Sequence, residues 1–166
     1  FERSSNLTRQ PLISVLTGQK PSRRPIWFMR QAGRYLPEYK NTRAQAGSFL
    51  DLCYSPKLAA EVTLQPLRRY DIDAAIIFAD ILVVPHAMGN GLKFAEGEGP
   101  VLETVRSMQD LARLQTGFGS AQFASIGTSV STVRAGLDKH VALIGFCGAP
   151  WTVASYMIEG RGSERE

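Results

Sequence analysis

The feature that most constrains the fold is an uninterrupted apolar run, Ala74-Ala-Ile-Ile-Phe-Ala79. A strand with one face in water alternates apolar and polar residues, whereas a strand covered on both faces is apolar throughout. The run therefore predicts a buried strand of a parallel sheet. Two further apolar segments, Pro25–Met29 and Val141–Phe146, are rich in β-forming residues and predict two more buried strands.

The segments between these strands carry helix signals. Ser55-Pro56 predicts a helix start, because serine caps backbone N–H groups and proline needs no donor at the first helical position. This helix is expected to run to about Tyr70, with a kink or an early end at Pro66. Ser107 and Asp110 form a capping box that opens a short helix. Further helices are expected over Asn6–Gly18, Pro37–Ala46 and Trp151–Ile158, and along an apolar face of Phe123, Ile126, Val130, Val133 and Leu137.

Strands that alternate with helices are typical of a parallel α/β fold. The chain of 166 residues is long enough for one domain with a sizeable core. An α/β barrel needs about 250 residues and eight strands, so a barrel of this kind would have only about its first three strands here. The glycine-bearing stretch Gly89–Pro100 and the charged end Glu159–Glu166 predict irregular loops.

The composition argues against several classes of protein. No apolar run approaches the ~18 residues that span a membrane, and no secretory signal is visible at the start of the sequence. The net charge of +4 favours an anionic partner, but the arginines are scattered, and nucleic-acid binding usually needs a basic stripe. Cys53 and Cys147 belong to no Cys-x-x-Cys pair, so we expect thiols in a cytoplasmic protein.

Chemically active side chains follow each predicted strand. In α/β folds, functional residues gather at the carboxyl ends of the strands. Arg30 and Arg34 follow the first strand, Asp80 follows the second, and Tyr156 lies in the helix after the third. Two cations, one anion and one phenol would then project into a common pocket at the carboxyl ends of the strands.

Each of these residues also has a structural interpretation. Arg30 and Arg34, four positions apart, suit an anion held between two guanidinium groups, but they can equally be solvated surface arginines. Asp80 needs partners if it is buried, and it can instead cap a backbone turn. Tyr156 can be a core residue with a satisfied hydroxyl. The residues alone therefore predict a polycarboxylate pocket with one acid inside it, and they leave the alternatives open.

No motif in the sequence indicates a cofactor. The glycines between positions 89 and 99 precede no Gly-Lys-Ser/Thr, and no Gly-x-Gly-x-x-Gly opens a helix. Neither a metal-ligand spacing nor a nucleophile elbow is present in the sequence.

Three blocks of the sequence resemble the uroporphyrinogen decarboxylase family. The first and most specific is Trp27-Phe-Met-Arg-Gln-Ala-Gly-Arg-Tyr-Leu-Pro-Glu38, and the second is Phe78-Ala-Asp-Ile-Leu82. The third is Gly145-Phe-Cys-Gly-Ala-Pro-Trp-Thr152, followed by Tyr156-Met-Ile-Glu-Gly160. The resemblance is in register from about Leu7 to the end of the sequence.

The resemblance implies a TIM (β/α)8 barrel, a homodimer and no metal or organic cofactor. It implies removal of the four acetate carboxylates of uroporphyrinogen III as CO2, giving coproporphyrinogen III in haem biosynthesis. Asp80 would hold the pyrrole N–H groups, and Tyr156 would contact the substrate near the reacting ring. The implied substrate-binding loop consists of Arg30, Gln31, Ala32, Gly33 and Arg34. Its two arginines would bind carboxylates, and one of them would assist proton transfer.

The same resemblance makes residues 1–166 the N-terminal part of one barrel domain, so we expect the natural protein to continue well past Glu166. Two alternative functions stay open. The first is a corrinoid-dependent methyltransferase of the same superfamily, whose zinc ligands come from the later half of the barrel. The second is a non-catalytic tetrapyrrole-binding module, which could keep the arginines but would not need Asp80.

Overall fold

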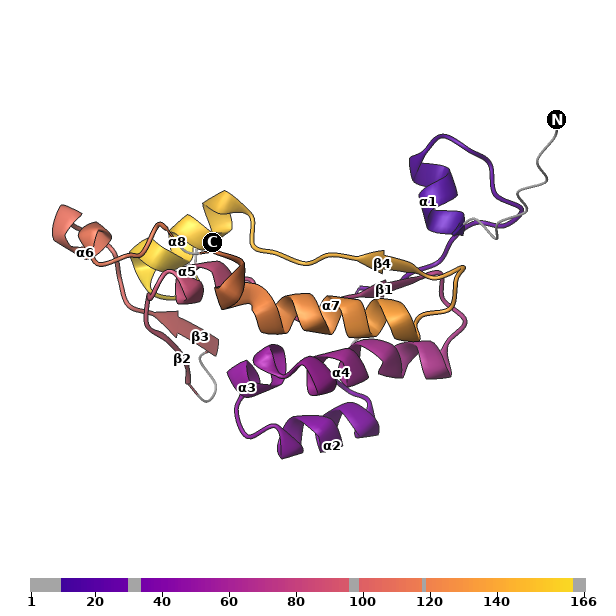
Figure 1. The fold of residues 1–166 in the computed structure, drawn as a ribbon, viewed down its shortest axis with the longest axis horizontal. Helices are drawn as coiled ribbons and strands as arrows, with labels where there is room; N and C mark the ends of the chain where they lie inside the picture. The colour runs from indigo at the N-terminus through magenta and orange to yellow at the C-terminus, as the bar shows by residue number, and fades with distance from the viewer. Residues whose placement is uncertain (1–9, 30–33, 96–98, 118, 163–166) are drawn as a thin grey trace. The chain divides into compact units, whose positions relative to one another are not determined.

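The computed structural model describes residues 10–29, 34–95, 99–117 and 119–162 (Figure 1). These residues form two compact units. The first, here called the sheet unit, comprises the described residues of Phe1–Phe78 and Thr128–Gly145. The second, here called the hairpin unit, comprises those of Ala79–Gly127 and Phe146–Glu166.

The sheet unit contains two of the predicted strands, paired in parallel. β1 (Ala74–Ile76) pairs with β4 (Ala142–Ile144). Both are shorter than the apolar runs predict, because the backbone soon bonds elsewhere. Ile77 N–H still donates to β4 at 3.0 Å, but Phe78 N–H donates to the buried Thr63 hydroxyl at 3.0 Å, which ends the ladder.

The prediction of a buried strand over residues 25–29 is wrong. The segment forms no strand, and the side chains of Phe28 and Met29 are 65% and 80% exposed. Ile26 O accepts a bond from Asp73 N–H at 2.9 Å, but Ile26 N–H donates to the Asp73 carboxylate at 2.7 Å. A side chain thus takes the donor that a neighbouring strand would use, and the preceding proline has none, so no regular ladder forms.

The main helix of the sheet unit begins where the sequence predicts. α4 (Pro56–Arg69) starts after Ser55, whose hydroxyl accepts the Leu58 N–H. It continues through Pro66, and the expected early end does not occur, because Pro66 is fully buried and packing holds this turn. The other helices of this unit are α1 (Pro11–Leu16), α2 (Pro37–Gln45), α3 (Phe49–Tyr54), which was not predicted, and most of α7 (Ala124–Gly136).

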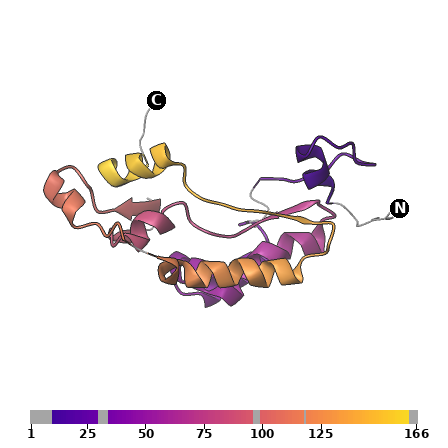
Figure 2. The same cartoon turned by 45° about the horizontal axis from the view of Figure 1, so that its top comes forward.

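Two apolar clusters join these helices to the strand pair. In the first, the Phe78 ring lies 6.1 Å from the Tyr39 ring of α2 and 5.6 Å from the Phe49 ring of α3, measured between centroids. In the second, Ala60 of α4 and Val133 of α7 pack with side chains of the strand segments. Figures 1 and 2 accordingly show α4 and α7 side by side along the strand pair.

The predicted apolar face of α7 is only partly buried. Val133 is fully buried and Leu137 packs in the same cluster, but Val130 is 38% exposed. Phe123 belongs to a 3-10 helix, η1 (Ser120–Phe123), that precedes α7. The spacing therefore predicts the helix correctly and overestimates the burial of its face.

The hairpin unit contains an antiparallel strand pair within the stretch predicted to be an irregular loop. β2 (Leu92–Ala95) pairs with β3 (Gly99–Leu102), and the directly opposed Leu92 and Leu102 are both buried. The loop prediction is wrong because burial of this cross-strand pair outweighs the glycine content. The unit also contains α5 (Val83–Ala87), α6 (Met108–Ala112), which opens with the predicted capping box, and α8 (Pro150–Glu159).

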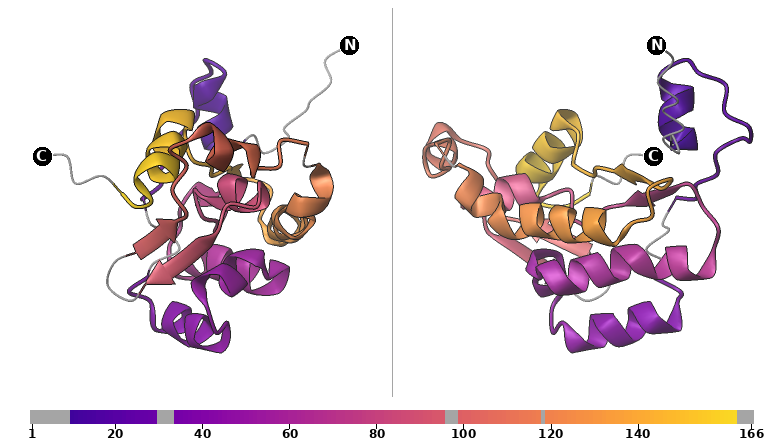
Figure 3. Two further views of the ribbon diagram at one scale, coloured as in Figure 1. Left: turned by 90° about the vertical axis from the view of Figure 1, so that its left-hand side faces the viewer. Right: turned by 45° about the vertical axis from the view of Figure 1, so that its right-hand side comes forward.

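Backbone hydrogen bonds fasten the end of α8 to β3 and to the residues that follow it. Leu102 N–H donates to Gly160 O and Val105 N–H donates to Met157 O, both at 2.7 Å. Gly160, predicted to lie in an exposed loop, is instead a buried helix cap with a left-handed φ of +81°. Figure 3 shows the hairpin strands and α8 from two further directions.

Candidate functional site

The predicted substrate-binding loop is covered in part by the structure. Arg30, Gln31, Ala32 and Gly33 lie outside the described residues, and their role stays a prediction. Arg34 lies in the sheet unit just before α2, exposed, with its guanidinium carbon 5.9 Å from the centre of the Phe49 ring. A cation at this distance is attracted to the aromatic face. The contact orients Arg34 while its positive charge is kept.

Arg34 lines a cavity of about 720 Å³ in the sheet unit. Two cationic side chains, Arg34 and Lys40, share this cavity with aromatic and aliphatic ones. The complete lining is Phe28, Met29, Arg34, Tyr35, Lys40, Pro66, Tyr70 and Ile72. Such a lining suits an anionic ligand with a broad apolar body, because the cations bind carboxylates and the rings cover apolar surface.

Two phenols of this cavity, Tyr35 and Tyr70, interact with each other. A hydrogen bond to Tyr70 raises the pKa of Tyr35, and desolvation contributes in the same direction. Tyr35 and Lys40 follow Arg34 closely in sequence and could have been named from it, whereas Tyr70 reaches the cavity only through the packing of α4.

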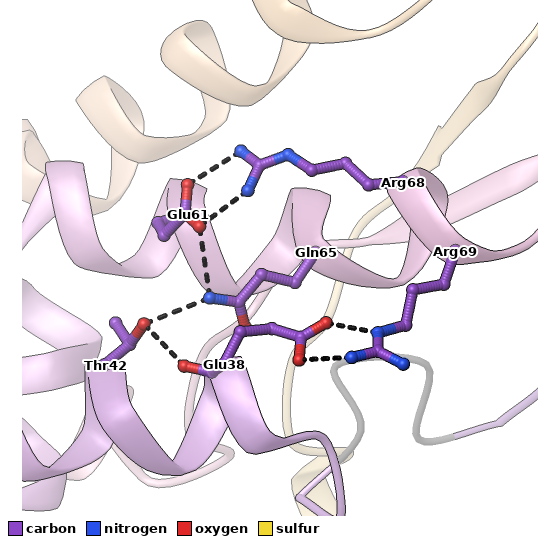
Figure 4. Close-up of polar contacts among 6 residues, drawn as sticks. All are labelled: Glu38, Thr42, Glu61, Gln65, Arg68 and Arg69. Atoms are coloured by element: carbon purple, nitrogen blue, oxygen red, sulfur yellow. Dashed lines mark hydrogen bonds and ion pairs between the residues drawn. The ribbon is translucent and has the colours of Figure 1, made fainter.

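A polar network fixes α2, the helix after Arg34, to α4 (Figure 4). Glu38 of α2 accepts two hydrogen bonds from Arg69 of α4, at 2.5 and 2.8 Å. The buried Gln65 amide donates to Thr42 Oγ1 at 3.0 Å and to Glu61 at 3.1 Å. The network therefore sets where α2 begins relative to α4, and with it the position of the preceding arginine.

We expect this network to weaken in acid. The Arg69 guanidinium lowers the pKa of Glu38, and the Arg68 guanidinium lowers the pKa of Glu61. A carboxyl group whose pKa is lower in the folded state stabilises the fold above its unfolded pKa of about 4.3. That contribution is lost as the pH falls through the folded value. The free energy of unfolding, measured by urea titration from about pH 7 to pH 3, should therefore decrease below about pH 5.

The matched protein for this measurement is Glu38→Gln/Glu61→Gln, which keeps side-chain size and removes both titrating groups. In this variant the free energy of unfolding should decrease less steeply below about pH 5 than in the unaltered protein, but it should still decrease. The capping serines also lower the pKa values of Asp51 and Asp110, and these groups remain in the variant. Identical slopes in the two proteins would show that the two glutamates add nothing.

Asp80 belongs to the hairpin unit and lies four residues beyond the end of β1, in the connection to α5. The predicted position directly at a strand end is therefore wrong, because β1 stops early. Its carboxylate Oδ1 accepts the Leu82 N–H at 2.8 Å, so the structural alternative, a capped backbone turn, is present. A carboxylate has lone pairs for several donors, and the substrate role of Asp80 stays a prediction.

Tyr156 lies in α8 of the same unit and is partly buried. Its hydroxyl would be 3.1 Å from a Cβ atom built on Gly162, so the chain after the helix covers it on one side. The segment that carries Asp80 and the segment that opens α8 meet where Ile81 approaches Gly148. Asp80 and Tyr156 are thus on contacting segments of one unit, while the common site that includes Arg34 of the other unit stays a prediction.

The described residues also bear on two other kinds of site, metal centres and membrane spans. Among them, no group of three or more His, Cys, Asp or Glu side chains has an arrangement that could hold a metal ion. Within the same residues, no helix combines the length and the apolar character needed to cross a bilayer. Cys53 is buried and Cys147 is exposed, and neither described cysteine is in a disulfide.

Comparison with known proteins points to one family. The family model described as "Uroporphyrinogen decarboxylase (URO-D)" matches residues 7–165. Proteins named uroporphyrinogen decarboxylase from Rhodospirillum rubrum, Chelativorans sp. and Brucella ovis are 54%, 52% and 53% identical to this chain. The matches cover 95%, 95% and 92% of this chain but 45%, 46% and 44% of those relatives. The chain therefore spans slightly less than half the length of the curated relatives it matches.

A solved structure supports the fold. A methyltransferase from Methanosarcina mazei superposes with a TM-score of 0.62, over 92% of this chain and 45% of that one. The sequence identity is 16%, so the likeness concerns the fold alone.

Proposed function

The chain belongs to the uroporphyrinogen decarboxylase family, and we therefore propose that it forms part of an enzyme that converts uroporphyrinogen III to coproporphyrinogen III. The predicted fold class, a TIM (β/α)8 barrel of which this chain supplies part, is also that of the family. Of the three predicted strands, two are present among the described residues, β1 and β4. In the proposed enzyme, residues 1–166 are the N-terminal part of one barrel domain. The enzyme is a cytoplasmic homodimer in haem biosynthesis that uses no metal or organic cofactor and binds neither nucleic acid nor membrane.

The observation that carries this proposal is the cavity around Arg34. It combines two cations with aromatic walls, which matches a macrocycle that bears carboxylates on its rim. Arg34 binds one of these carboxylates, and Arg30, with Gln31, Ala32 and Gly33, completes the loop around the substrate. Arginine suits this role because its planar fork binds a carboxylate through two parallel hydrogen bonds.

Asp80 supplies the electrostatic part of the proposed reaction. A proton adds to the pyrrole carbon beside an acetate arm, and the ring becomes a cation. The bond to the carboxylate carbon then breaks, its electron pair neutralises the ring, and CO2 leaves. A second proton converts the resulting methylene to a methyl group as the ring carbon loses the first. The Asp80 carboxylate accepts hydrogen bonds from the pyrrole N–H groups and stabilises the cation, and Tyr156 contacts the substrate near the reacting ring.

Two other functions are separated from this proposal by particular observations. A corrinoid-dependent methyltransferase is supported only by fold, because the methyltransferase structure shares 16% identity, whereas the decarboxylases share 52–54%. A tetrapyrrole-binding module without catalysis would not need an acid at the pyrrole nitrogens. Two results together would favour that module. The unaltered protein would show no turnover of uroporphyrinogen, and a variant without Asp80 would still bind it.

The test of the proposed function is a chimera in which this chain replaces the matched segment of the Rhodospirillum rubrum relative. The chimera should release CO2 from uroporphyrinogen and form coproporphyrinogen. An inactive chimera that is folded and binds uroporphyrinogen would overturn the decarboxylase proposal and leave the binding module.

In the chimera, Arg34→Ala should weaken substrate binding more than it destabilises the fold. The loss of one charge-assisted contact should cost about 2 kcal/mol, roughly 30-fold in KM. Arg34→Lys should also be impaired, since lysine cannot reproduce the planar fork. Steady-state kinetics and thermal melts on the same samples check this expectation.

The control for Arg34 is Lys57→Ala, which removes a positive charge from an exposed position on α4 outside the cavity. It should change neither KM nor the melting temperature appreciably. A large fall in the melting temperature of Arg34→Ala with an unchanged KM would show that Arg34 has only a structural role.

A further inference from the structure

We propose that Gly148 is a positioning residue for Asp80: its missing side chain lets the segment that carries Asp80 lie against the start of α8, the helix of Tyr156. This inference rests on the proposed function for its effect on turnover. The contact itself is independent of that function, because it is a property of the described hairpin unit.

The space at Gly148 is filled by two other groups. A Cβ atom built there would lie 2.6 Å from the Ile81 carbonyl oxygen and 2.6 Å from Val153 Cγ2, with Ile81 Cβ at 3.3 Å. Carbon atoms do not approach other heavy atoms this closely in folded proteins, so any side chain forces its surroundings to move. Gly148 is not among the glycines with positive φ, so the requirement is for space and not for a special backbone conformation.

The two groups around Gly148 belong to the two segments that carry the predicted site residues. Ile81 lies between Asp80 and Leu82, whose N–H donates to the Asp80 carboxylate at 2.8 Å. Val153 lies in the first turn of α8, where its N–H donates to Ala149 O at 2.9 Å. The glycine therefore sets the separation between the Asp80 turn and the beginning of the helix that carries the tyrosine.

An alanine at this position would act mainly on the Asp80 side. Val153 is β-branched and has one strongly preferred rotamer in a helix, so its side chain cannot easily turn away. The Ile81 oxygen is a backbone atom, and it can retreat only if the Asp80–Leu82 turn moves with it. Because displacements of about 1 Å near reacting atoms cost as much as 100-fold in rate, a smaller shift of Asp80 should lower kcat roughly 10-fold.

The experiment compares Gly148→Ala with Gly145→Ala in the chimera. Gly145 precedes Gly148 by three residues and is exposed, and apart from its chain neighbours no described residue has an atom within 4 Å of a Cβ built on it. Three quantities are measured for each protein: the hydrogen exchange rate of the Leu82 amide, kcat for uroporphyrinogen, and KM for uroporphyrinogen. We expect Gly148→Ala to speed Leu82 exchange and to lower kcat about 10-fold at a nearly unchanged KM. Gly145→Ala should leave all three quantities unchanged.

The outcomes separate this inference from the proposed function. If the unaltered chimera does not decarboxylate, the proposed function fails, and the Leu82 exchange rate still tests the positioning contact. If Gly148→Ala leaves both Leu82 exchange and kcat unchanged, the positioning inference is wrong. A lowered melting temperature with normal kcat for the folded fraction would show a merely structural glycine and would also overturn it.

If Gly148→Ala does not fold, the double variant Gly148→Ala/Val153→Ala takes its place. The double variant removes the short contact with Val153 Cγ2 and keeps the short contact with the Ile81 carbonyl oxygen. That variant should fold and still show the faster Leu82 exchange and the lower kcat. Normal values in this folded variant would contradict the proposed role of the Ile81 carbonyl contact.

Discussion

Asp80→Asn should reduce decarboxylation by about 100-fold or more, as removal of a key electrostatic group does in other active sites. Asparagine has nearly the size of aspartate but no charge, and its amide N–H groups would face the pyrrole N–H groups, donor against donor. The ring cation formed on protonation would lose the anion that stabilises it. The effect should therefore fall mainly on kcat.

The same substitution separates the electrostatic role of Asp80 from its role in the backbone turn. The asparagine Oδ1 can still accept the Leu82 N–H, so the 2.8 Å bond that caps the turn is kept. Asp80→Glu makes the converse change, since it keeps the charge and displaces it by one methylene. Glutamate should retain some activity, with an altered KM because the macrocycle shifts from the arginines.

Turnover of uroporphyrinogen and thermal melts, measured on the same samples of the chimera, distinguish an electrostatic role of Asp80 from a structural one. Near-normal turnover by Asp80→Asn would rule out the central-carboxylate mechanism. Unfolding of Asp80→Asn, although the acceptor of the cap is retained, would make Asp80 a structural residue.

Arg23→Ala should lower the free energy of unfolding by about 3 kcal/mol, because it leaves a buried carboxylate without its counter-ion. The Asp73 side chain is 1% exposed, and the Arg23 guanidinium binds both of its oxygens, at 2.7 and 2.8 Å. Only the Ile26 N–H, at 2.7 Å, would remain as a described partner of that carboxylate. Urea unfolding of the chimera measures the change.

Two variants make this expectation specific. The double variant Arg23→Ala/Asp73→Asn removes the buried charge together with its partner, and the amide oxygen of the introduced side chain can still accept the Ile26 N–H. It should recover much of the lost stability, since breaking a buried pair costs more than replacing it. Arg24→Ala removes the neighbouring exposed arginine and should have little effect. A loss below about 0.5 kcal/mol for Arg23→Ala would show that water screens this pair effectively.

The elements that could be predicted from the sequence are those whose signals are local. Ser55 with Pro56, and Ser107 with Asp110, place helix starts correctly because a cap depends on residues one turn apart. The run 74–79 predicts a parallel strand correctly, because a strand buried on both faces is apolar at every position. The wrong predictions concern segments whose structure depends on residues far away in the sequence. The predicted strand at 25–29 does not form because the carboxylate of Asp73 takes the Ile26 N–H.

The candidate site also has some features with a local sequence signal and others that depend on distant residues. From the sequence, the charge and planar guanidinium of Arg34 predict carboxylate binding, with a solvated surface arginine as the alternative, and the structure adds the aromatic side chains that line the same cavity. Tyr70 could not be associated with Arg34 from spacing, because the packing of α4 brings them together. The close approach at Gly148 likewise has no local signal, since it depends on the carbonyl of Ile81 from a different segment.

The pairing of β1 with β4 also bears on how the chain folds. The two strands are adjacent in space, yet residues 77–141 separate them in sequence. Closing a long loop costs chain entropy before any contact is gained, so non-local pairings of this kind form slowly. Most of the intervening segment belongs to the hairpin unit, whose β2–β3 ladder is local and can form quickly. Early formation of that hairpin would shorten the chain that remains to be closed, and we expect the pairing of β1 with β4 to be the slow step.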